Sequence, residues 1–152
     1  MSIVWTAPTV EHPARDASRR SMDAVVRKAK TEWLDLFATD AVVEDPVGTS
    51  AFDPVGAGHR GRDAIAAFWD LAIDKVVQFT FTIHDSFAAG DESANVGVIS
   101  AYLPGGWRVD TEGVFVYRVN ESGLILSLRA FWEVDRVMAT ARQVSDGASA
   151  PS

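Results

Sequence analysis

The residue best suited to chemistry is Asp45, which lies between Glu44 and Pro46. It follows a short β-prone run, residues 41–44, and in strand parity it points to the same side as Val43, whereas Glu44 points to the solvated side. A carboxylate on the apolar side could accept a proton as a general base. An aspartate before proline is also a common turn former, so a purely structural interpretation stays open.

Other chemistries have less support. The chain has no cysteine, and its three histidines, His12, His59 and His84, are scattered, so the sequence offers no metal-ligand spacing and no thiolate nucleophile. The glycines at 56–58 lack the preceding strand and following helix of a nucleotide-binding loop. No Ser/His/Asp arrangement follows from spacing. We therefore expect no metal and no cofactor.

Length and charge restrict the class of protein. A chain of 152 residues with 47% hydrophobic residues suits one domain with one core. Its net charge of -7 gives no attraction to nucleic acid or to anionic membrane surfaces. The N-terminus lacks the pattern of a signal peptide, and no apolar run is long enough to span a membrane. A cytoplasmic location is the default expectation.

Two helices should precede the strands. Apolar residues recur at helical spacing over 20–37, which predicts a helix with a break near Thr31, and again from Asp63 onwards. Between them, residues 47–61 form a glycine-rich loop with a repeated Asp-Pro-Val-Gly turn. The ends, 1–15 and 139–152, have no such periodicity and indicate flexible tails around one domain at 16–138.

The second half alternates with a period of two, which indicates strands over 77–84, 94–103, 107–119 and 124–134, joined by glycine-containing turns. Residues 94–103 are apolar on both alternating sets, so both faces of that strand should be covered. Helices followed by consecutive strands predict an α+β fold with helices on one face of a curved antiparallel sheet.

Four segments carry a family resemblance: 36–48, 61–69, 113–120 and 129–134. Together they resemble Δ5-3-ketosteroid isomerases, and especially actinobacterial ketosteroid-isomerase-like proteins of the SnoaL-like and nuclear transport factor two-like superfamily. The resemblance implies a cone-shaped sheet wrapped around an apolar cavity, and a homodimer formed through the outer face of the sheet. Such a dimer would cover the second apolar face of 94–103, although packing within one domain would also do so.

The family chemistry uses an aspartate base beside an oxyanion hole made of a tyrosine and a protonated aspartate, a known case of pKa tuning. The resemblance places the base at Asp45, the tyrosine position at Ser21 and the protonated aspartate position at Phe115. Phe115 cannot donate a hydrogen bond, and Ser21 has a shorter reach than a phenol. Loss of one such donor typically costs about a hundred- to a thousand-fold in rate. The standard isomerase should therefore be weak here.

The resemblance also implies a binding wall. Trp69 and Trp132 match pocket-facing aromatic positions, and each carries one N–H donor. Each could equally be plain core. The other expected substrate-binding residues share strand parity or motif position with this wall: Thr111, Gly113, Phe115, Leu128 and Ala130.

Two functions from different classes follow. The first is an isomerase-like enzyme that acts on a steroid or similar apolar carbonyl compound, with Asp45 as general base. The second is a non-catalytic binder of steroid-like ligands, suggested by the apolar Phe115. Epoxide hydrolysis, which the same fold hosts, would need Asp110 with Arg108 to enter the pocket, whereas parity places both on the outer face.

Overall fold

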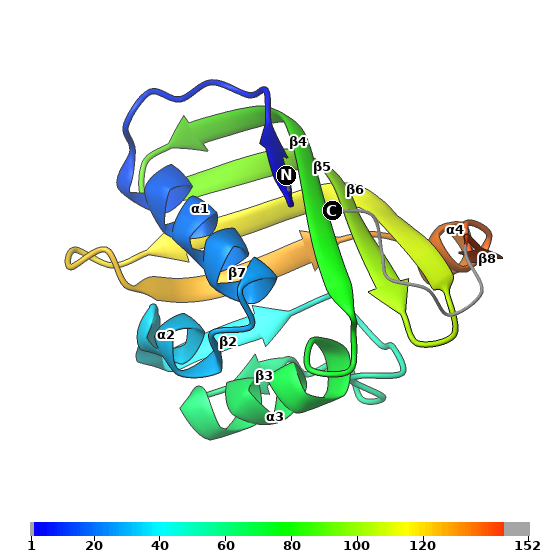
Figure 1. The fold of residues 1–152 in the computed structure, drawn as a ribbon. Coiled ribbons are helices and arrows are strands. Elements are labelled where there is room, and N and C mark those ends of the chain that lie inside the picture. The colour runs from blue at the N-terminus through cyan, green and yellow to red at the C-terminus, as the bar shows by residue number, and fades with distance from the viewer. Residues whose placement is uncertain (1, 145–152) are drawn as a thin grey trace.

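The computed structural model describes residues 2–144, which form one α+β domain (Figure 1). The strands are β1 (Ile3–Trp5), β2 (Phe37–Glu44), β3 (His59–Arg60), β4 (Gln78–Ala89), β5 (Glu92–Leu103), β6 (Trp107–Val119), β7 (Ile125–Phe131) and β8 (Arg142–Gln143). The helices are α1 (Pro13–Val26), α2 (Lys30–Asp35), α3 (Arg62–Ala72) and α4 (Val134–Met138). The predicted α+β class with a curved sheet is confirmed.

The strands make one mixed sheet in the order β1-β4-β5-β6-β7-β2-β3, with β8 paired to β6. Its centre, from β4 to β7, is the antiparallel meander expected from the sequence. Two flanking pairs depart from the expected antiparallel arrangement, because β1 pairs with β4 and β2 pairs with β7 in parallel. These flanking strands reach their neighbours by crossing the domain rather than through a hairpin, so no tight turn imposes an antiparallel direction.

A pair of glycines accompanies the bend in the sheet. Gly97 in β5 and Gly113 in β6 are directly opposite in register. A Cβ at Gly97 would lie 2.1 Å from the backbone oxygen of Thr82, and one at Gly113 would lie 2.3 Å from that of Phe131. The missing side chains therefore let neighbouring backbone approach closely at mid-strand, where an interior glycine is otherwise unfavourable. Around this bend the sheet curves over α1, while α3 packs along β2 and β3 (Figure 1).

The break between the first two helices covers residues 27–29, just before the predicted position at Thr31. α1 ends at Val26, Lys28 has a positive φ of 58°, and α2 begins at Lys30, so Thr31 is not its cap. A left-handed residue just after a helix is a standard stop signal. The Lys28 ammonium then donates to backbone oxygens after α3, including that of Ile73 at 3.1 Å, and so ties the turn to the next helix.

Both predicted tails contain structure. Ile3–Trp5 forms β1 on the edge of the sheet, and α1 already begins at Pro13. At the other end, Arg142–Gln143 pairs with β6, while the predicted tail residues 145–152 lie outside the described part of the chain. No helix within residues 2–144 is long and apolar enough to cross a membrane.

Candidate active site

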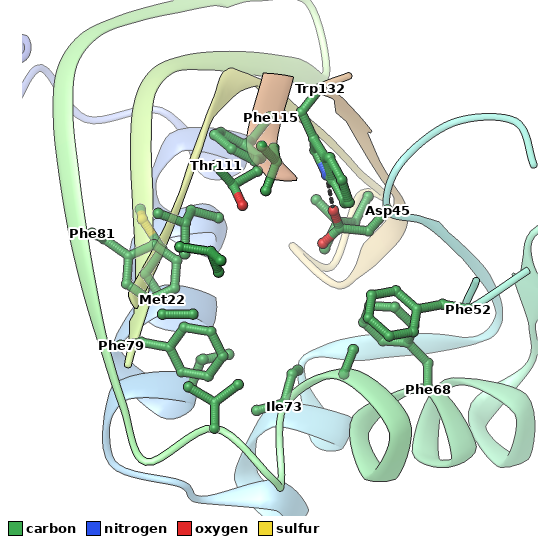
Figure 2. Close-up of a pocket in the computed structure, with 18 of the residues that line it drawn as sticks. Met22, Asp45, Phe52, Phe68, Ile73, Phe79, Phe81, Thr111, Phe115 and Trp132 are labelled. Carbon is green, nitrogen blue, oxygen red and sulfur yellow. Dashed lines mark hydrogen bonds between the residues drawn. The ribbon is translucent and has the colours of Figure 1, made fainter. Parts of the chain in front are cut away.

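A cavity of about 390 Å³ lies between the inner face of the sheet and the helices. This volume falls in the range of small-molecule sites. Figure 2 shows that aromatic and aliphatic side chains face it from several elements, among them Met22, Phe52, Phe68, Phe79, Phe81 and Phe115. At its open side lie Val134 and Met138 of α4, which are 43% and 60% exposed. The lining thus suits a ligand that is mostly hydrocarbon.

Asp45 follows the last residue of β2, and its carboxylate points into the cavity (Figure 2). The indole Nε1 of Trp132, which follows the end of β7, donates to Asp45 Oδ1 at 2.6 Å. Glu44 is turned away to an ion pair with Arg129 at 3.0 Å. The alternation of the strand therefore separates two adjacent carboxylates, one facing the cavity and one bound to a surface arginine.

The surroundings of Asp45 favour its protonated form more than water does. Asp45 lines the apolar cavity, and burial there raises the pKa of its carboxyl above the ordinary value. The hydrogen bond from Trp132 and the charge of His59 act in the opposite direction, to a smaller extent. A carboxylate with a raised pKa is a stronger proton acceptor, which suits a general base.

A second polar region lies where the cavity is most buried. Ser21 of α1, Asn95 of β5 and Tyr117 of β6 line the cavity there and are 2%, 1% and 6% exposed. We call these three residues the deep end. Trp33 Nε1 donates to Ser21 Oγ at 3.0 Å, and the Tyr117 hydroxyl is 3.1 Å from the same oxygen. Burial is the main cause that raises the pKa of Tyr117 well above its ordinary value, so the phenol stays protonated.

Buried hydrogen bonds fix the orientation of Asn95. Arg15 Nε donates to Ser86 Oγ at 3.0 Å, and Ser86 Oγ donates in turn to Asn95 Oδ1 at 2.8 Å. Asn95 Nδ2 donates to Ser18 Oγ at 2.9 Å, and Ser18 Oγ donates to the backbone oxygen of Arg15 at 2.7 Å. Because a guanidinium can only donate, the direction of the whole chain is set, and the amide nitrogen of Asn95 keeps one further proton.

Six of the residues selected from the sequence line the cavity: Ser21, Asp45, Thr111, Phe115, Leu128 and Trp132. The cavity lining does not include Trp69, Gly113 or Ala130. Trp69 packs on the ring of Trp33 at 5.2 Å, on the core side of that cavity-lining ring. Gly113 serves the close strand approach described above, and Ala130 is fully buried between β6 and the loop after β2, where its backbone oxygen accepts from Val47 N at 2.9 Å.

Sequence reasoning missed Tyr117 and Asn95 as site residues. The parity that selected Thr111 and Phe115 also places Tyr117 on the inner face, because it is two residues beyond Phe115. Asn95 is the register partner of Phe115 on β5, which only the strand pairing reveals.

Charged groups elsewhere do not add to the cavity. Asp110 forms ion pairs with Arg108 at 2.9 Å and with Arg142 at 3.0 Å, and none of the three lines the cavity. An acid and arginine set for epoxide hydrolysis is therefore not assembled there. The His59 ring lies 4.9 Å from the ring of Phe68 at a tilt of 48°, and His59 does not line the cavity. Among residues 2–144, no group of three or more metal-ligating side chains comes together.

Comparison with known proteins finds one matching family model and several similar solved structures. The family model described as SnoaL-like domain matches residues 18–128. A search of curated protein sequences gives no significant match. Among solved structures, RV0760c from Mycobacterium tuberculosis in complex with estradiol-17beta-hemisuccinate is 36% identical, with a TM-score of 0.78, and the match covers 87% of this chain and 99% of that one.

Two further structures are similar over the same extent. A Δ5-3-ketosteroid isomerase from Mycobacterium sp. is 35% identical with a TM-score of 0.78, and a computationally designed 17-OHP binder is 34% identical with a TM-score of 0.79. Each match covers 87% of this chain and 98% of the other. Since the family model spans most of the described domain, and the fold agrees with it, the chain belongs to the SnoaL-like domain family, with a ketosteroid-isomerase-like fold.

Proposed function

We propose that the chain is a cofactor-independent isomerase that acts on a steroid or a similarly flat, apolar carbonyl compound. The observation that carries the proposal is the Asp45 carboxylate, which faces a hydrocarbon-lined cavity and is held by Trp132 Nε1 at 2.6 Å. The steroid ligand of one relative and the isomerase activity named for another support the substrate class.

The reaction needs one proton carrier. Asp45 removes a proton from the carbon between the carbonyl and an isolated double bond, and the electron pair of the broken C–H bond moves onto the carbonyl oxygen as an enolate. The enolate then collapses, its electrons take the proton from Asp45 at the far carbon of the double bond, and a conjugated ketone forms. Asp45 returns to its ionised state, so atoms and charge balance without any cofactor.

The hydrogen bond from Trp132 positions the Asp45 carboxylate for these proton transfers. It fixes one oxygen of the carboxylate and leaves the other free towards the ligand. A base held in one orientation reacts faster than a mobile one, because the reacting atoms meet in a productive geometry.

The test compares the wild type with Asp45→Asn on a 5-ene-3-ketosteroid, followed by the ultraviolet absorbance of the conjugated product. Asp40→Asn is the matched control, because Asp40 is an exposed aspartate of the same strand. We expect turnover in the wild type and the control and its near loss in Asp45→Asn. Equal rates in all three proteins would refute the proposal.

A non-catalytic binder is the second candidate, and Phe115 favours it. Its ring occupies the position where the family chemistry has a protonated aspartate, and it lines the same cavity. On this account the wild type binds a ketosteroid tightly without converting it, and Asp45→Asn binds as well or better because a buried charge is removed. Any conversion that depends on Asp45 excludes this candidate.

We further propose that two copies associate through the outer face of the sheet. Val96, Val114 and Phe131 lie side by side across β5, β6 and β7 in register, and Phe131 is 44% exposed. Charges of both signs border this row, including Glu112 and Arg129, so a two-fold partner could match them. A half-buried apolar row that ends in an exposed ring is consistent with a contact surface.

The dimer is tested by light scattering after size-exclusion chromatography. Val114→Lys should give a monomer of half the wild-type mass, whereas Val55→Lys, at an 83% exposed residue outside the row, should leave the mass unchanged. A wild-type protein that is monomeric at about 100 μM would contradict the proposal, since stable homodimers persist at that concentration.

A further inference from the structure

The deep end of the cavity holds more hydrogen-bond donors than the protein itself uses. Ser21 Oγ must accept from Trp33 Nε1, because an indole nitrogen only donates. Ser21 and Tyr117 then share a single hydrogen bond between their two hydroxyls. Two hydroxyl protons and one shared bond leave one proton for another acceptor.

The hydrogen bond between the two hydroxyls can run in either direction. With Tyr117 as the donor, the Ser21 proton is left over. With Ser21 as the donor, each step reinforces the next, because a hydroxyl that accepts from Trp33 becomes a better donor itself. In that arrangement the phenol proton of Tyr117 is the free one, and Tyr117 lines the cavity. A phenol also reaches further from a strand than a serine hydroxyl reaches from a helix.

Asn95 supplies a second donor beside it. Its amide is fixed by Ser86 and Ser18, and its second Nδ2 proton has no role in that chain. Asn95 and Tyr117 come from adjacent antiparallel strands, both on the inner face, with Asn95 opposite Phe115. Residues placed diagonally in this way are close enough for their side chains to reach one atom.

We propose that Tyr117, held by Ser21, and the Asn95 amide together bind the carbonyl oxygen of the ligand. These two donors, at positions 95 and 117, would replace the donors that the family pattern has at positions 21 and 115. Ser21 is a positioning residue in this account, because it orients the phenol rather than touching the ligand. The ligand enters with its oxygen first, and its reactive carbons come to lie towards Asp45.

The electrostatics agree with this orientation. Burial is the main cause of the raised pKa of the Tyr117 phenol, and the negative charge of Asp45, which lines the same cavity, adds to it. A carboxylate on one side and neutral donors at the other is the arrangement that an enolate needs, because negative charge leaves the base and gathers on the oxygen.

The inference rests on the proposed function in one respect, namely that the ligand binds in this cavity. Binding measurements can test the oxygen site even if the protein converts no substrate. The probes are a 3-ketosteroid and its 3-deoxy analogue, titrated into the wild type, Tyr117→Phe and Asn95→Ala. We expect each substitution to weaken ketosteroid binding about three- to tenfold, the effect of one net hydrogen bond, and to leave the deoxy analogue unchanged. Unchanged deoxy affinity also shows that the variant is folded with an intact cavity.

Tyr102→Phe is the matched control, because Tyr102 is the other tyrosine of the chain and does not line the cavity. A second readout is the carbonyl stretching frequency of the bound ketosteroid, which should rise in Tyr117→Phe as the oxygen loses a donor. For Ser21, the frequency should rise in Ser21→Ala and return towards the wild-type value in Ser21→Thr, which restores the hydroxyl.

If the wild type binds the ketosteroid, three results would still overturn the inference. They are equal wild-type affinity for the keto and deoxy ligands, an unchanged keto preference in Tyr117→Phe, or a loss as large in Tyr102→Phe. These outcomes are independent of the base, since Asp45→Asn can abolish turnover while the keto preference remains. Conversely, turnover that is unaffected by Asp45→Asn would end the isomerase proposal and leave the oxygen site standing. No ketosteroid binding by the wild type would contradict both.

Discussion

Asp45 and the deep end differ in what they can offer a ligand. The Asp45 carboxylate accepts one hydrogen bond from Trp132 and retains further acceptor capacity towards the cavity. Tyr117 and Asn95 are held by other polar groups and retain protons to donate. The acceptor is contributed by the position that the family motif implies, whereas the donors are contributed by neighbouring positions. On our proposal, the acceptor thus stays at the family position while the donors come from other residues.

Variants at the two regions should separate catalysis from binding, and this gives the largest expected effect. Asp45→Asn should lower kcat by about a hundred- to ten-thousand-fold, the range for loss of a general base, and should not weaken ketosteroid binding. Tyr117→Phe should lower kcat and binding together, because its donor contacts the oxygen in both the ketone and the enolate. The measurement is kcat with a 5-ene-3-ketosteroid beside Kd for the conjugated product. Equal effects of both variants on Kd would contradict this division between a catalytic Asp45 and a ligand-binding Tyr117.

Removal of the Asp45 charge should also stabilise the fold, by about 1 kcal/mol at pH 7. The folded pKa of Asp45 lies above the ordinary value of 3.8, so the folded state binds more protons than the unfolded state between these two pKa values. The free energy of unfolding therefore falls as pH rises through that window and stays lower above it. Asparagine does not ionise and escapes this loss.

Urea unfolding of Asp45→Asn and the wild type at pH 7 and near pH 4 checks this sign. The advantage of Asp45→Asn should be larger at pH 7 and should narrow as pH falls towards 4. Asp40→Asn should show no comparable advantage, because Asp40 is exposed. A wild type that is more stable than Asp45→Asn at pH 7 would show that the charged carboxylate is stabilised in the fold.

The smallest expected effect is a displacement of the pH profile. Trp132 lowers the pKa of Asp45 through its hydrogen bond, so Trp132→Phe should raise that pKa further. Since only the ionised carboxylate acts as a base, the acid limb of kcat/KM should move to higher pH in Trp132→Phe. Trp107→Phe is the control, because Trp107 is 46% exposed and does not line the cavity. An acid limb that stays in place would mean that Trp132 does not tune the base.

Local patterns predicted the orientation of Asp45 towards the cavity, while its catalytic role stays a prediction. Asp45 could be selected because motif and strand parity both act over a few residues, and parity also separated it from Glu44. The helices and the four central strands could be predicted for the same reason, since each is long enough to show its own period. β1 and β8 have three and two residues, too few to display a period, and they were assigned to tails.

Tyr117 and Asn95 could not be selected by the same means. The family pattern has its two donors at positions 21 and 115. This chain has Ser21 and Phe115 there, which indicates that the family donors are lost. The compensating groups are two residues along β6 and across the register on β5, so only the pairing of strands brings them to the cavity. Trp69 shows the converse error, because an indole at a pocket-facing position in the family pattern is packed into the core behind Trp33.

The central claim is that one carboxylate carries one proton from carbon to carbon, and isotope transfer tests it most directly. A 5-ene-3-ketosteroid labelled with deuterium at the carbon between the carbonyl and the double bond is converted in ordinary water, and the product is analysed by mass spectrometry and NMR. The account predicts that a substantial share of the deuterium reappears at the far carbon of the former double bond, because the ligand in the cavity shields the Asp45 proton from exchange with solvent. Complete loss of the label during wild-type turnover, or a rate unaffected by Asp45→Asn, would contradict it.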